Sequence, residues 1–119
     1  MSRAKIIKEE HSEQGTSFFA VYIETKNANQ LFLSESEDMM GTLAVAMPKT
    51  KNLVGSPLSM VLLGDRNMTI SRLLAELLAQ KTNKISLVSV FTKSVTEHEA
   101  VPILRKLMDK TLKKEEETK

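Results

Sequence analysis

The chain has 119 residues, with 17 basic and 15 acidic side chains, a net charge of +2, few aromatic residues and no cysteine. A charge this balanced does not predict nucleic-acid binding, which usually shows as a basic stripe with stacking aromatic residues. The lack of cysteine excludes disulfides, thiolate metal sites and cysteine nucleophiles. The length suits a single domain over residues 1–119, with a polar end at 113–119 that is expected to fray.

The first residues, MSRAKIIKEEH, lack the apolar segment of a secretory signal. No apolar run has the length that a membrane-spanning helix requires. These features predict an intracellular protein of the cytoplasm or the nucleus that does not associate with a membrane.

Six segments have the apolar and β-branched composition of strands and are separated by turn residues. The first is weak because Ile6 and Ile7 are its only strong apolar positions, and the turns that flank the second strand are expected at His11–Ser17 and Lys26–Asn29. The predicted strands are Ala4–Glu10, Ser17–Thr25, Gln30–Ser34, Gly41–Met47, Leu58–Leu63 and Lys84–Lys93.

A helix is predicted directly after the fifth strand, because aliphatic residues recur there at the spacing of one helical face. Asn67 or Thr69 is expected to cap its start, and Asn83 to end it in the left-handed conformation. The buried face is predicted to hold Ile70, Leu73, Leu74, Leu77 and Leu78, and the face toward water to hold Ser71, Arg72, Glu76 and Gln80.

A second helix follows the sixth strand, where Thr96 and Glu99 have the spacing of a capping box. Pro102 lies too far from Thr96 to occupy the first helical position, where proline is common. Either the helix starts nearer Pro102 or its first turn is irregular. Its apolar positions are Val101, Leu104, Leu107, Met108 and Leu112.

The element order βββββαβα predicts an α+β fold in which two helices and a mostly antiparallel sheet of about six strands form two layers. Several strands are apolar on both faces, although two helices can cover only one face of the sheet. We therefore expect a partner to cover the other face. In the second strand, the two apolar sets are Phe18, Ala20 and Tyr22 against Phe19, Val21 and Ile23; in the fifth, they are Leu58, Met60 and Leu62 against Val61 and Leu63.

Residues with catalytic or metal-binding potential are scarce. The four glycines stand singly, so no phosphate-binding loop is predicted, and His98 between two glutamates is best interpreted as a solvated residue of the first helical turn. We expect no catalytic residue, no metal and no cofactor. The seven methionines suit either an adaptable binding surface or core filling, and their positions in strands and helices favour core filling.

Four short motifs carry a resemblance to a known family. They are Leu31-Phe32-Leu33, LAVAM at Leu43–Met47, LLGD at Leu62–Asp65 and KTNK at Lys81–Lys84. Together with the alanine- and leucine-rich helix between the last two, they resemble the third and fourth proteasome-assembling chaperones, and the fourth most closely.

The resemblance implies an antiparallel sheet flanked by helices and a non-catalytic function. It implies a heterodimer with a paralogous proteasome-assembling chaperone, which binds α subunits of the proteasome core particle and promotes α-ring assembly. A small dimeric intracellular scaffold or adaptor unrelated to the proteasome is the alternative. A small-molecule enzyme ranks third because no acid–base pair supports it.

Charged residues of three segments are the candidates for partner binding. The acidic segment at residues 35–38 suits a basic partner, a metal or a solvated turn, and its serines suit phosphorylation. The lysines at the end of the first helix suit either an acidic partner or the helix dipole. The candidates are Glu35, Glu37, Asp38, Lys49, Lys51, Lys81 and Lys84.

Overall fold

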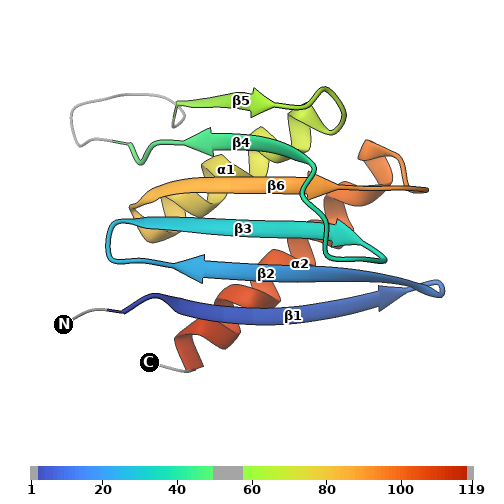
Figure 1. Ribbon diagram of the computed structural model, residues 1–119, viewed down its shortest axis with the longest axis horizontal. Helices are drawn as coiled ribbons and strands as arrows, with labels where there is room; N and C mark the ends of the chain where they lie inside the picture. The colour runs from blue at the N-terminus through green and yellow to red at the C-terminus, as the bar shows by residue number, and fades with distance from the viewer. Residues whose placement is uncertain (1–2, 50–57, 118–119) are drawn as a thin grey trace.

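The computed structural model describes residues 3–49 and 58–117. Its strands form one sheet in the order β1-β2-β3-β6-β4-β5, in which every pair is antiparallel except the parallel pair of β3 and β6 (Figure 1). The α+β class and the element order are as predicted. The elements are β1 (Lys5–Glu13), β2 (Thr16–Glu24), β3 (Ala28–Glu35), β4 (Thr42–Ala46), β5 (Ser59–Leu63), α1 (Met68–Thr82), β6 (Ile85–Phe91) and α2 (Glu97–Glu117).

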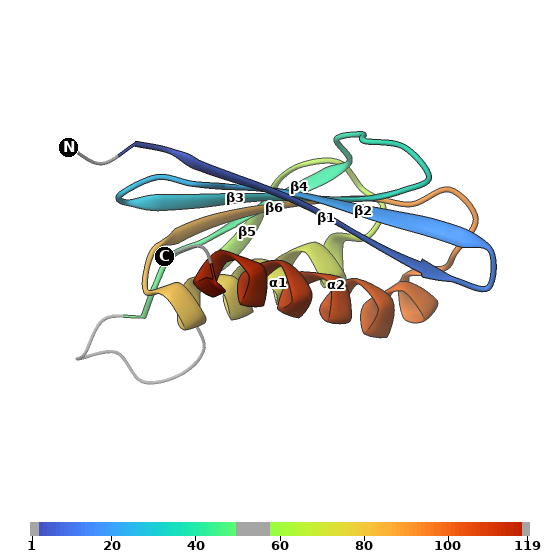
Figure 2. The same cartoon turned by 90° about the horizontal axis from the view of Figure 1, so that it is seen from below.

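Both helices lie on the same face of the sheet, so the molecule has two layers (Figure 2). Helix α1 packs against β4, β5 and β6, whereas α2 packs against β1 and β2. The strands alternate accordingly. In β2, Phe18, Ala20 and Tyr22 are buried against the helices, whereas Phe19, Val21 and Ile23 remain partly exposed on the other face.

The first turn is shorter than the sequence predicts. Strand β1 continues to Glu13, and only Gln14 and Gly15 form the turn, both with positive φ. A two-residue turn of this type matches the twist of a β-hairpin, and it brings His11 opposite Phe18. The prediction of a turn over His11–Ser17 is wrong because β1 is polar along much of its length and shows little of the apolar alternation typical of a strand.

The buried face of α1 is rotated from the predicted one. Leu74 is fully buried, but Leu73 is 41% exposed and Leu77 is only partly buried. Ser71, which was expected to face water, is buried and donates its hydroxyl to the Asn67 carbonyl 2.7 Å away. The alternation of Leu with small residues explains the difference, because Ser71, Ala75 and Ala79 allow the helix to lie close against the sheet, and all three are buried.

The start of α1 is held by the other helix rather than by its own cap. Asn67 precedes the helix in a left-handed conformation and makes no side-chain cap bond; its amide instead donates to Thr92 Oγ1 at 2.9 Å. The Ile70 N–H donates to Glu97 Oε2, also at 2.9 Å. Asn67 therefore occupies the predicted N-cap position of α1, but it does not supply the expected side-chain cap bond. The left-handed Asn83 at the end of α1 is confirmed.

Helix α2 begins with the predicted capping box. The Glu99 N–H donates to Thr96 Oγ1 at 3.2 Å, and the Thr96 N–H donates to Glu99 Oε1 at 3.0 Å. Pro102 therefore lies inside the helix, not at its start. The helix continues to Glu117, and Glu115 is buried, so α2 extends through residues 113–117 of the polar end.

Removal of the α2 cap has a measurable expected effect. Thr96→Ala is expected to lower the free energy of unfolding by ~1 kcal/mol, because the Glu99 N–H loses its acceptor. Thr69→Ala is the matched control, because Thr69 is exposed in the first turn of α1 and caps nothing. Urea denaturation of both variants measures the difference. Equal losses would contradict the assignment of the cap to Thr96.

Candidate functional site

The sheet face that neither helix covers, called the outer face below, is the first candidate surface. Cross-strand partners place its side chains in rows, one of which runs through Ile23, Gln30, Leu87, Val45 and Met60. Most members of these rows are apolar, and they span β2 to β5. The apolar members are Phe19, Val21, Ile23, Phe32, Leu43, Val45, Met60, Leu87 and Phe91.

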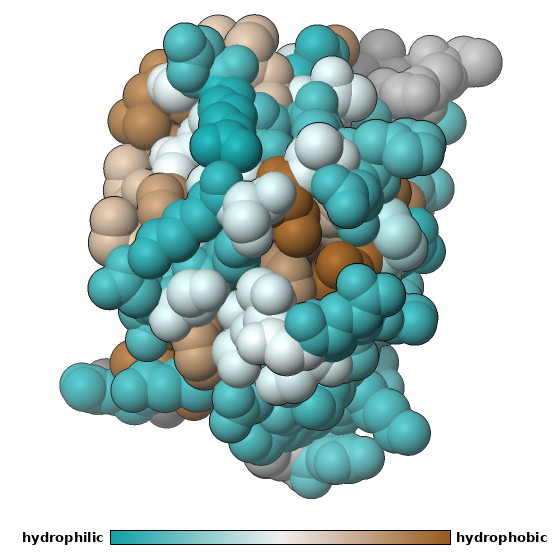
Figure 3. Space-filling view, turned by 90° about the vertical axis from the view of Figure 1, so that its right-hand side faces the viewer, coloured by the Kyte–Doolittle hydropathy of each residue, from teal (hydrophilic) through white to brown (hydrophobic). Residues whose placement is uncertain are grey.

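Strand β1 gives the outer face a polar border. Lys8 lies opposite Val21 and Glu10 lies opposite Phe19, so charged side chains flank the apolar rows along one edge. Figure 3 looks along the sheet from the right-hand end of Figure 1, and brown and tan residues collect along its left-hand margin, where the outer face lies. The surface thus has an apolar centre and a charged rim on the β1 side.

The connection from β3 to β4 crosses the outer face, because β6 lies between these two strands (Figure 1). The Gly41 N–H anchors it by donating to Ser89 Oγ at 2.8 Å. A Cβ at Gly41 would collide with the Val90 carbonyl oxygen, so the close approach requires glycine. Met39 and Met40 of this connection border small cavities above Phe32, and Met40 is 53% exposed.

The methionines of the described residues mostly face solvent. Met108 belongs to the core, whereas the others from Met39 onward are exposed. The prediction that methionine mainly fills the core is therefore wrong. Unbranched, polarisable thioethers adapt to different partner shapes, which favours a binding surface. The exposed methionines are Met39, Met40, Met47, Met60 and Met68.

Strand β5 forms one edge of the sheet and exposes apolar side chains along its whole length. Met60 is 59% exposed, and Leu62 is an extra residue at a bulge opposite β4. The sequence predicts one apolar set on each face of this strand. In the structure Val61 is partly buried, and the other apolar residues are exposed. The exposed residues of this edge are Leu58, Met60, Leu62 and Leu63.

The predicted acidic segment divides into a buried and an exposed part. Glu35 belongs to β3, and its carboxylate accepts hydrogen bonds from the backbone N–H groups of residues 93–95 and from the Ser94 hydroxyl at 2.6 Å. Glu37 pairs with Lys93 Nζ at 2.9 Å, and Asp38 borders the cavity above Phe32. Glu35 is therefore buried and closes the turn between β6 and α2.

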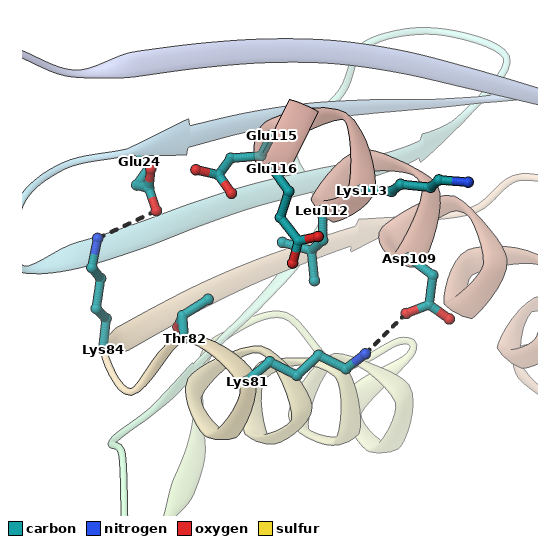
Figure 4. Close-up of a pocket in the computed structure, with 9 residues that line it drawn as sticks. All are labelled: Glu24, Lys81, Thr82, Lys84, Asp109, Leu112, Lys113, Glu115 and Glu116. Carbon is teal, nitrogen blue, oxygen red and sulfur yellow. Dashed lines mark hydrogen bonds and ion pairs between the residues drawn. The ribbon is translucent and has the colours of Figure 1, made fainter. Parts of the chain in front are cut away.

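The predicted lysine corner lines a groove of about 540 Å³ between the ends of α1, α2 and β2 (Figure 4). Lys81 Nζ lies 3.4 Å from Asp109 Oδ1, and Lys84 Nζ lies 3.3 Å from Glu24 Oε2. Each lysine is thus paired with an acid inside the chain. The structure brings these two lysines together at one groove. Lys49 is exposed after β4 and is not among the residues that line this groove, and Lys51 lies outside the described residues.

Other kinds of site have little support. Across residues 3–49 and 58–117, no group of three or more His, Asp or Glu side chains could hold a metal ion. In the part of the chain that the structure describes, neither helix is long and apolar enough to cross a bilayer. His98 is exposed, as expected.

Comparisons with known proteins support the family resemblance of the sequence and the fold of the structure. The family model described as proteasome assembly chaperone 4 matches residues 14–90, more than half of the chain. A chain in the crystal structure of a chaperone complex for yeast 20S proteasome assembly has the same fold, with a TM-score of 0.68 and 16% identity. That match covers 89% of this chain and 93% of the yeast chain. A search of curated proteins finds no match.

Proposed function

This chain belongs to the proteasome assembly chaperone 4 family, and on that premise we propose how it acts. It pairs with a paralogous proteasome-assembling chaperone, and the heterodimer binds α subunits of the core particle and promotes α-ring assembly, without catalysis, in the cytoplasm or the nucleus. The observation that carries this proposal is the outer face, which is apolar, bears methionines and is left uncovered by both helices.

The outer face suits the paralogue. Stable interfaces bury ~800 Å² per partner and have an apolar centre with a polar rim. The rows from β2 to β5 supply such a centre, and Lys8 and Glu10 supply the rim. A monomer rarely leaves so continuous an apolar surface in water, and this favours a permanent partner over a transient one.

The α subunit requires a weaker contact, because a chaperone has to leave before the particle is complete. Rim charges alter association rates and salt dependence more than affinity. Asp38 and Lys49 are exposed and suit this role, as does Lys51 by its position in the sequence. Lys81 and Lys84 have internal partners, and Glu35 is buried, so we give them no part in it.

The direct test mixes the purified heterodimer with individual core-particle α subunits at two salt concentrations. At least one α subunit is expected to bind, and to bind more slowly at the higher salt concentration. A heterodimer that is intact but binds no α subunit would move the unrelated scaffold to first place.

A substitution on the outer face tests whether the paralogue binds there. Met40→Glu is expected to weaken heterodimer formation at least tenfold, which corresponds to ~1.4 kcal/mol, because it places a charge in the apolar contact. Leu73→Glu is the control, since Leu73 is similarly exposed but lies on α1 in the opposite layer. Calorimetric titration gives both affinities. Equal effects of the two substitutions would contradict this use of the outer face.

A further inference from the structure

We infer that the open edge of β5 takes up an extended segment of the client α subunit, which pairs with β5 as an added strand. This inference rests on the proposed function and deepens it, because it names the surface and the kind of segment that the client would supply. It separates the client site at the edge of the sheet from the paralogue site on the outer face.

The two edge strands of the sheet, β1 and β5, differ in how well they are protected from pairing with another chain. Edge strands that must stay unpaired usually carry charges or are covered. Strand β1 has both kinds of protection: it is rich in Lys and Glu, and two lysines of α2 donate to its backbone. Lys110 Nζ donates to the Glu10 carbonyl at 2.7 Å, and Lys114 Nζ donates to the Lys8 carbonyl at 3.3 Å. Strand β5, with the sequence SMVLL, has no charged residue and exposes apolar side chains.

The backbone of β5 is oriented for pairing. The Met47 N–H donates to the Leu58 carbonyl at 3.0 Å, and Met60 is the partner of Val45. Hydrogen-bonded pairs alternate along an antiparallel ladder, so Met60 bonds to β4, whereas the N–H and C=O groups of Ser59 and Val61 point away from β4, to the open edge. Among residues 3–49 and 58–117, no group is bonded to them from that side.

The neighbours of β5 define the chemistry of the added strand. Its side chains on the outer-face side would lie beside Met60 and Leu62, which calls for apolar residues. On the helix side they would lie beside Ser59, whose hydroxyl contacts both Arg72 and Glu76 of α1, which calls for polar or charged residues. The segment is therefore an extended one with apolar residues on its outer-face side, a polar residue beside Ser59 and an apolar residue beside Val61.

A second copy of the chain fits the edge less well. Pairing of two β5 strands would join five-residue strands, a contact far smaller than the ~800 Å² per partner of a stable dimer. It would also leave both outer faces in water. A client strand has neither difficulty, because it can bind while the paralogue covers the outer face, and its few bonds permit later release.

The test uses the intact heterodimer and each purified α subunit as the probe. Val61→Pro removes an N–H that points to the open edge, and edge strands tolerate proline at such a position. Val61→Thr is the matched control, since it keeps the N–H and is also β-branched. Val61→Pro is expected to form the heterodimer normally and to bind the α subunit at least tenfold more weakly, whereas Val61→Thr stays within about twofold of the wild type. Leu62→Lys, at an exposed position, replaces Val61→Pro if the proline variant does not fold.

Hydrogen exchange provides a second readout. On α-subunit binding, the amides of Ser59 and Val61 are expected to exchange at least tenfold more slowly, whereas those of β1 do not change. If both Val61→Pro and Leu62→Lys bind the α subunit with wild-type affinity, or if protection is confined to other elements, this inference is overturned and the proposed function still stands. Protection of Ser59 and Val61 in the isolated chain at rising concentration would assign the edge to a second copy. A wild-type heterodimer that binds no α subunit would instead overturn the proposed function.

Discussion

Leu74→Ala is expected to lower the free energy of unfolding by about 2–5 kcal/mol, the range for removing a large aliphatic side chain from a packed core. Leu74 is fully buried between α1 and the sheet, and it belongs to the same apolar cluster as Val88 and Val90 of β6. The residual cavity would lie at the centre of the molecule, where the surrounding strands can relax little. Urea or thermal denaturation measures the loss.

The adjacent residue supplies a matched control. Leu73 has the same chemistry and lies on the same helix, but it is 41% exposed. Leu73→Ala is expected to change stability by less than ~1 kcal/mol, as surface substitutions usually do. Similar losses from the two variants would mean that the helix has the orientation predicted from the sequence pattern, with Leu73 on its buried face.

Glu35→Gln is expected to cost at least ~2 kcal/mol at neutral pH, because hydrogen bonds to a charged group are worth ~1.5–3 kcal/mol each and glutamine keeps a single acceptor oxygen. Its amide would face the N–H groups of residues 93–95, which are donors as well. Glu37→Gln is the control, since Glu37 is exposed and its ion pair with Lys93 lies at the surface.

The loss should depend on pH in a defined direction. Burial raises the pKa of Glu35, but the hydrogen bonds from Ser94 and from the backbone of residues 93–95 outweigh it, so the pKa lies below its ordinary value of 4.5. A carboxyl whose pKa is lower in the folded state stabilises the protein above its unfolded pKa. The stability difference between wild type and Glu35→Gln should therefore be complete above pH 4.5 and vanish as the pH falls through the folded pKa. A difference that stays constant with pH would contradict a charged role for Glu35.

Much of the fold is encoded locally, which is why the sequence predicts it. The i, i+3, i+4 spacing in α1 and the capping box at Thr96 and Glu99 both depend on neighbours in the chain. The strand order is not local. Nothing in the residues near Ile85 indicates that β6 pairs with both β3 and β4, because that pairing depends on how distant segments meet.

The surroundings of the candidate residues are less predictable than the fold, for a similar reason. Charge alone suggested Glu35, but β3 extends as far as this residue and turns its carboxylate to the β6–α2 turn. The sequence pattern assigns the exposed methionines to the core, because apolar residues in a strand usually indicate burial. It predicts the apolar second face of β5 but not the position of β5 at an open edge of the sheet. The absence of charge from β5, beside the charged β1, is the signal in the sequence that could have identified the edge.

The position of β6 between β3 and β4 has a consequence for how the protein is made. During synthesis, β1, β2 and β3 leave the ribosome first and can form a meander, and β4 and β5 can form a separate hairpin. The two halves cannot join until the strand that lies between them, ending at Phe91, has emerged. Until then, the two halves lack this neighbour, and such incomplete sheets are prone to wrong pairing. The sheet of a protein whose family assists assembly is thus itself joined by the strand that is made after its five neighbours in the sheet.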